Sequence, residues 1–122
     1  MKFVKITNSS NLQVSPIKVW HCNSFFSRFR GLMLKKDLRI NEGALLVQGS
    51  ESRMGSSIHM LFMNFDLGII WINAEGFIVD KKVAKRWQLS STPQSAAMFI
   101  LEIHPDRLID FSNGDKIQFD YE

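Results

Sequence analysis

Ser-Ile-His-Met-Leu-Phe-Met-Asn-Phe-Asp-Leu-Gly-Ile-Ile-Trp-Ile-Asn, residues 57–73, is the densest apolar run in the chain. Its end, Leu67 to Ile72, carries no charge, and its β-branched and aromatic residues suit the pleated surface of a strand. We predict a strand here that is buried on both faces, with residues 69–72 almost fully buried. Residues 73–76 end in glycine and predict a turn, so residues 77–79 return as the second strand of a central β-hairpin.

Length, charge and cysteine content bound the class of protein. The 122 residues, 45% of them hydrophobic, predict one domain over residues 1–122. No apolar stretch reaches the about 20 residues of a transmembrane helix, and the first residues lack a secretory signal, so we expect a soluble, cytoplasmic protein with no membrane partner. The net charge of +3 is scattered, which does not fit a nucleic-acid interface. Cys22 is the single cysteine and fits a reducing compartment, while the oligomeric state stays open.

Short segments separated by turns predict further strands. Lys2–Thr7 fits a short edge strand, and Pro16 gives Val14–Trp20 an edge position or a bulge, because proline has no amide proton for a neighbouring strand. Residues 49–57 predict a polar loop. The other predicted strands are 44–47, 97–103 and 116–121, and residues 81–94 predict a strand or irregular structure.

Two short helices are expected beside these strands. Asn23 or Ser24 can cap a helix whose apolar residues recur at helical spacing as far as Met33. Pro105 suits the first turn of a second helix over residues 106–111. Many short strands with only one or two short helices predict a mostly-β fold, either an antiparallel sandwich or a barrel-like sheet.

Six short motifs occur in one order along the chain. Residues 29–33 read Phe-Arg-Gly-Leu-Met, residues 57–73 are the apolar run that ends in Ile-Ile-Trp-Ile-Asn, and Trp87 follows further along the chain. The remaining motifs lie at residues 76–79, 101–103 and 114–117. Together they resemble the R-G-L-M/L, S-I-H-T-F-F-M-R-F-P-I-D-V-V-F-L-D, P-W-R, D-G-x-V, L-E-L and G-D-x-L/V motifs of the family called domain of unknown function 192. The resemblance implies a small, mostly-β, sandwich-like protein of an uncharacterised family and assigns no biochemical activity.

The chain departs from this family pattern at the centre of the longest motif. Residues 66–68 stand where the family has P-I-D, so Asp66 replaces the proline and Gly68 replaces the aspartate. If the family aspartate serves a site, the resemblance implies that the site is altered or lost here. We expect Gly68 to open space beside Leu67, and we expect Gly68→Asp to be tolerated if Arg30 pairs with a carboxylate. The candidate carboxylates are Asp66, Glu102 and Asp115.

A cluster of charged and aromatic side chains is the best candidate binding site: Arg30, His59, Asp66 and Trp87. An arginine, a histidine and a carboxylate can bind an anionic small molecule, with Trp87 stacking beside it. The structural alternative is that Arg30 forms an ion pair and His59 is a satisfied core group. We therefore predict a binding module for a small molecule or peptide, with a shallow cleft near the central strand and no catalytic residue.

Two other classes of function stay open. A small hydrolase can use His59 with Asp66 or Cys22, although the adjacent His21 points to the opposite face of a strand and a small buried cysteine is the simpler interpretation. A protein-interaction module can bind its partner through a sheet edge.

Metal ligands are a further possibility that the sequence raises. Three methionines near His59 suit a soft metal, but methionine more commonly fills gaps in a core. The sequence contains no zinc, calcium or phosphate-loop motif, so we expect neither a metal nor a cofactor. The methionines are Met54, Met60 and Met63.

Overall fold

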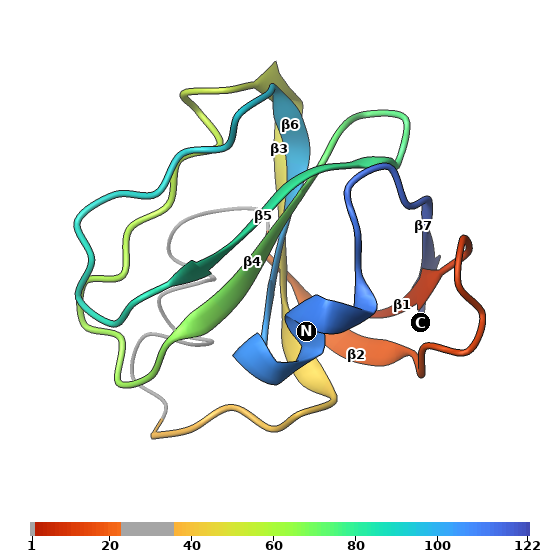
Figure 1. The fold of residues 1–122 in the computed structure, drawn as a ribbon, viewed down its shortest axis with the longest axis horizontal. Helices are drawn as coiled ribbons and strands as arrows, with labels where there is room; N and C mark the ends of the chain where they lie inside the picture. The colour runs from red at the N-terminus through yellow and green to blue at the C-terminus, as the bar shows by residue number, and fades with distance from the viewer. Residues whose placement is uncertain (1, 23–35) are drawn as a thin grey trace.

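The computed structural model describes residues 2–22 and 36–122, which form a mostly-β fold (Figure 1). Strands make up 48% of the structure and helical turns 6%, so the predicted fold class is confirmed. The strands are β1 (Phe3–Asn8), β2 (Ile17–Cys22), β3 (Glu42–Ser52), β4 (Leu67–Ile72), β5 (Ile78–Ala84), β6 (Ala97–Ile103) and β7 (Ile117–Tyr121), and a 3-10 helix, η2, spans Pro105–Asp110.

All seven described strands form one mixed sheet in the order β5-β4-β6-β3-β2-β1-β7. The β2–β3 pair is parallel and the other pairs are antiparallel. The outer strands approach each other where they begin: the Ile78 N–H donates to the Asp115 carbonyl at 2.9 Å, and the Ile117 N–H donates to the Gly76 carbonyl at 2.8 Å. The sheet is therefore strongly curled but does not close into a barrel.

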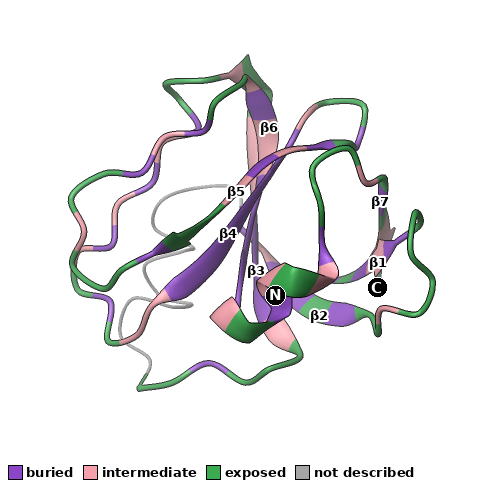
Figure 2. Cartoon of the chain, viewed as in Figure 1, coloured by how far each residue is buried: buried purple, intermediate pink, exposed green. Residues whose placement is uncertain are grey.

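The central hairpin lies where the sequence predicts it. Every residue of β4 is buried, which Figure 2 shows as one unbroken colour along the strand. Ile69 and Trp71 enter the core on one face of the sheet, and Ile70 and Ile72 enter the core on the other. The turn closes with Gly76 at φ 90°, a conformation in which L side chains are strained. The apolar run of β4 thus supplies both sides of the core.

The positions of the first two strands correct the sequence prediction. β1 lies between β2 and β7, and β2 lies between β1 and β3, so neither is an edge strand. Pro16 precedes β2 and removes no hydrogen bond from the sheet. β3 is longer than predicted and takes in the first part of the expected 49–57 loop, because Ser52 pairs with Ala97 of β6 beyond a register shift.

The predicted second helix is confirmed as η2. Arg107 holds η2 against the neighbouring segments of the chain. The Arg107 side chain is 7% exposed, and its Nε donates to the Asp110 carboxylate at 2.6 Å. Its Nη1 donates to Asn41 Oδ1 at 2.8 Å and its Nη2 to the Ser15 carbonyl at 2.6 Å. One guanidinium therefore ties η2 to the segments that precede β2 and β3, as the fork geometry of arginine allows.

η2 also corrects the expectation of open space beside Leu67. Leu108 of η2 packs over Gly68, and a Cβ at Gly68 would lie 2.7 Å from the Leu108 Cγ. That distance is shorter than van der Waals contact permits. Leu108 therefore fills the space beside Gly68, and no pocket is left between these two described residues. The tolerance of Gly68→Asp was expected only if Arg30 pairs with a carboxylate, and Arg30 lies outside the described residues; the close approach of Leu108 leads us to expect that this substitution is destabilising.

Some predictions fall on residues 23–35. The first helix, the Phe-Arg-Gly-Leu-Met motif and Arg30 lie outside the described residues. Among the helices of residues 2–22 and 36–122, none is long and apolar enough to cross a membrane.

Candidate functional site

A cleft of about 260 Å³ opens beside the start of β4. It combines an apolar surface with four charged or titratable side chains. The described residues that line it are Asp37, Leu38, Phe65, Asp66, Arg86, His104 and Pro105. The cleft lies next to the central strand, where the sequence places a binding site.

Asp66 is the best-anchored polar group in this cleft. Its Oδ1 accepts a hydrogen bond from the Arg86 backbone N–H at 2.8 Å and another from the Arg86 Nε at 3.3 Å. The Lys85 Nζ lies 3.6 Å from its Oδ2. The backbone hydrogen bond from Arg86 is the largest cause that lowers the pKa of Asp66, and the charges of Arg86 and Lys85 add to it. Asp66 is therefore ionised at neutral pH and holds the Arg86 side chain by its Nε.

Arg86 and His104 both line the cleft and both carry hydrogen-bond donors. A guanidinium has five N–H donors, and Asp66 takes one of those of Arg86, whose side chain is 60% exposed. The His104 Nδ1 accepts a hydrogen bond from the Asp106 N–H at 3.1 Å and caps η2. Because Nδ1 is the acceptor, the neutral imidazole carries its proton on Nε2, which is a donor.

The four predicted site residues lie in different places. Asp66 lines the cleft, whereas the Trp87 ring contacts Phe62 at a centroid distance of 5.3 Å. Trp87 donates its backbone N–H to the Met60 carbonyl at 2.9 Å, and the half-buried His59 accepts a hydrogen bond from the Leu61 N–H at 3.3 Å. The His59 segment thus pairs with the segment that carries Trp87, next to the cleft. Arg30 lies outside the described residues.

Sequence reasoning missed Arg86, His104 and Asp37. Arg86 directly precedes the Trp87 motif, and this was the available signal for it. His104 had no comparable signal, because it reaches the cleft through the pairing of β4 with β6. Gly68 is opposite Ile103 in that pair, so the residues before β4 lie beside the residues after β6. Strand pairing and not sequence proximity assembles this site.

The structure places Cys22 and the residues around it. Cys22 is fully buried, which confirms the interpretation of a small buried cysteine. His21 next to it turns to the opposite face, where its Nδ1 lies 3.0 Å from the Tyr121 hydroxyl. In the part of the chain that the structure describes, His, Cys, Asp and Glu side chains form no group of three that can hold a metal ion.

A curled, mostly-β sheet with a charged cleft at the start of its central strand defines the class, a small mostly-β protein. Residues 4–119 match the domain of unknown function 192, described as Uncharacterized ACR, and the chain belongs to this family. A UPF0127 protein from Thermococcus kodakarensis is 38% identical over 109 residues, covering 84% of this chain and 68% of that protein. One from Thermococcus gammatolerans is 36% identical over 84% of this chain and 70% of its own length. The family predicted from the motifs is thus confirmed.

Two solved structures share the fold. A crystal structure from Sinorhizobium meliloti, of a protein suggested to be a transcription regulator, has a TM-score of 0.81 at 17% identity, covering 97% of this chain and 92% of that one. A protein of unknown function from Novosphingobium aromaticivorans has a TM-score of 0.73 at 18% identity, covering 95% of this chain and 83% of that one. At these identities the likeness concerns the fold alone.

The lowered pKa of Asp66 makes a pH-dependent prediction. A carboxylate with a depressed folded-state pKa adds stability above its unfolded pKa, and that stability is lost as the pH falls through the folded value. Asp66→Asn should therefore cost about 0.5–1 kcal/mol at pH 7, since the ion pairs are partly solvated, and progressively less as the pH falls through the folded-state pKa of Asp66. Urea unfolding of both proteins at several pH values measures the difference. Glu75→Gln in the exposed β4–β5 turn is the control, and an equal pH trend in both variants would contradict the assignment.

Proposed function

We propose that this protein is a binding module for a small zwitterionic molecule that carries a carboxylate, an ammonium group and a compact apolar side chain. One observation carries the proposal: the cleft beside β4 brings a guanidinium and carboxylates to an apolar surface in about 260 Å³. Small-molecule sites typically combine a mostly apolar concave surface with a few placed polar groups.

Each part of the ligand has a counterpart in the cleft. The Arg86 guanidinium can take the ligand carboxylate with the donors that Asp66 does not use, as bidentate arginine–carboxylate pairs do. Asp37 is an exposed carboxylate in the segment before β3, and it suits the ligand ammonium group. The apolar side chain would lie on Leu38, Phe65 and Pro105. The lining thus favours a ligand of both charges over a simple anion.

The same geometry favours binding over catalysis. Asp66 is engaged by two cations, which stabilise its charge and make it a poor base. Cys22 is buried in the core and is not among the described residues of the cleft. The expected cytoplasmic location and the expected lack of a nucleic-acid partner remain part of this proposal and rest on the sequence.

A titration with L-leucine tests this function. We expect leucine to shift the backbone amide NMR signals of residues 37–38, 65–66, 86 and 104 in a saturable way. Isoamylamine, which lacks the carboxylate, and 4-methylpentanoate, which lacks the amine, should each bind at least about tenfold more weakly, because each leaves one charged group of the cleft without its counterpart.

Two variants locate the binding site. Arg86→Gln should weaken leucine binding by about tenfold, because it removes a charge-assisted hydrogen bond. Arg53→Gln is the matched control, since this exposed arginine lies in the segment after β3 and contacts Met54. Equal binding by both variants, or leucine shifts away from the cleft, would reject the proposed ligand class.

A further inference from the structure

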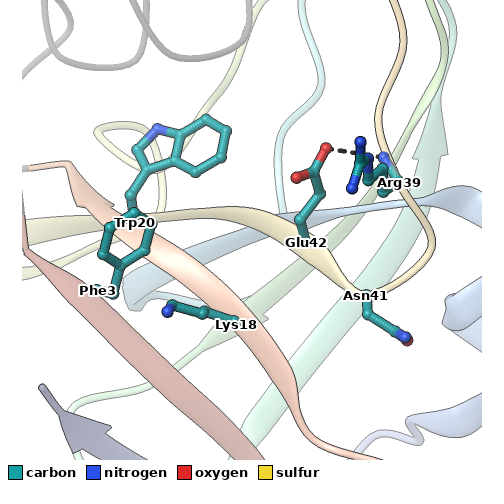
Figure 3. A pocket seen from close by; sticks show the side chains of 6 residues that line it. All are labelled: Phe3, Lys18, Trp20, Arg39, Asn41 and Glu42. Atoms are coloured by element: carbon teal, nitrogen blue, oxygen red, sulfur yellow. Dashed lines mark hydrogen bonds between the residues drawn. The ribbon is translucent and has the colours of Figure 1, made fainter.

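A second cavity, separate from the cleft of the proposed function, lies over β1, β2 and the start of β3 (Figure 3). Its volume is about 230 Å³. The Phe3 and Trp20 rings lie at one end with the Lys18 amine beside them, and Arg39 and Glu42 lie at the other end. The described residues that line it are Phe3, Lys18, Trp20, Arg39, Asn41 and Glu42.

Strand register explains why these residues share one surface. Phe3 lies directly opposite Trp20 in the β1–β2 pair, and residues opposite each other in an antiparallel pair project to the same face. Lys18 is two residues from Trp20 and therefore also lies on that face. In the parallel β2–β3 pair, Glu42 is opposite Lys18 and Ala44 is opposite Trp20. The small side chain of Ala44 leaves room beside the indole.

Charged side chains of both signs contribute to the cavity. The Lys18 Nζ lies 4.6 Å from the centre of the Phe3 ring and 3.4 Å from the Glu122 carboxylate, in a pair whose members are both more than half exposed. Arg39 is exposed, and its backbone N–H donates to Glu42 Oε1 at 2.9 Å. The lining thus contains two cations and one carboxylate, and that carboxylate already accepts a hydrogen bond.

We propose that this cavity binds a small aromatic carboxylate. The ring of the ligand would pack against the Trp20 and Phe3 rings, since aromatic pairs add to the free energy of burial. Its carboxylate would lie between Lys18 and Arg39, the two cations of the lining. A neutral aromatic compound would contact the rings but would not pair with Lys18 or Arg39. An aromatic amine would be repelled by these two cations.

Phenylacetate is the probe for this site. We expect it to shift the amide signals of residues 3, 18, 20, 39 and 42 together with the indole N–H of Trp20, whose signal Trp20→Phe identifies. Phenylacetamide, which is neutral and has nearly the same shape, should bind about tenfold more weakly, because it lacks the charge that Lys18 and Arg39 attract. A signal pattern confined to the Asp66 cleft would overturn the proposal.

Arg39→Gln separates a binding role from a structural one. This side chain is exposed, so the variant should keep the melting temperature of the wild type and lose about tenfold in phenylacetate affinity. Arg53→Gln should change neither quantity. Equal affinity of Arg39→Gln and wild type, or equal binding of phenylacetate and phenylacetamide, would overturn the proposal. Leucine binding to the Asp66 cleft should be unaffected by Arg39→Gln, so the two sites can fail independently.

Discussion

Replacing Gly68 by aspartate should destabilise the protein by about 3–5 kcal/mol, although this substitution restores the residue of the family pattern. The new Cβ would lie 2.7 Å from the Leu108 Cγ, in a strand that is buried along its whole length. The carboxylate would also lose its hydration at a site that Leu108 covers. Urea unfolding followed by far-UV circular dichroism at pH 7 measures the change in free energy.

A double-mutant cycle separates the steric cause from the charge. Gly68→Ala keeps the clash without the charge and should cost less than Gly68→Asp, about 1–3 kcal/mol. Leu108→Ala removes the atoms that the new methyl group meets. Gly68→Ala should therefore be nearly neutral in the Leu108→Ala background. The cost of the double variant would then be smaller than the sum of the two single costs, as expected for residues in contact. Additive costs would show that Leu108 does not fill the space beside Gly68.

Gly43→Ala is expected to cost at least about 3 kcal/mol, because its methyl group would meet a main-chain atom that cannot move alone. A Cβ at Gly43 would overlap the Glu102 carbonyl oxygen and lie 3.2 Å from the Ile103 Cγ2. Gly43 pairs with Ile103 in the β3–β6 ladder, near the middle of the sheet. Relief of the overlap would separate these two strands.

The same strand provides the matched control for this substitution. A methyl group on Gly49 would meet no atom within 4 Å apart from its chain neighbours, so Gly49→Ala should be neutral within about 0.5 kcal/mol. Gly43→Ala and Gly49→Ala are the same residue change, so the difference between their free energies of unfolding, measured by chemical denaturation, reports the close approach of Glu102 to Gly43. A small and equal effect at both positions would contradict the packing of β3 against β6.

The sequence predicted those parts of the fold in which local pattern and burial agree. The uncharged run of β4 has one environment available to it, the interior, and a glycine-ended turn follows it directly. β6 was predicted at residues 97–103, the bounds that the structure has, because its apolar residues are bounded by turn residues. Pro105 likewise marked the first turn of η2. In each of these cases the residues that predict the element lie within about ten residues of one another in the sequence.

Pairing between distant strands could not be predicted in this way. Alternation within β1 and β2 predicts strands but carries no information about neighbours. Lys2–Thr7 was therefore predicted at an edge, and Pro16 suggested an edge or a bulge for Val14–Trp20, whereas neither strand lies at an edge. The parallel β2–β3 pair depends on a long connection, which local turn signals do not describe. Open space at Gly68 was inferred from one missing side chain, whereas Leu108 lies 40 residues further along the sequence.

The candidate site divides in the same manner. By itself the sequence determined the family, the mostly-β class and the buried central hairpin, because motifs and hydrophobic patterns are properties of contiguous residues, and it proposed Asp66 as a candidate site residue. Only the tertiary structure brought Arg86 and His104 to Asp66 and placed Phe3 beside Trp20. The physical reason is that strand register fixes which side chains meet across a sheet, and register depends on the packing of the whole core.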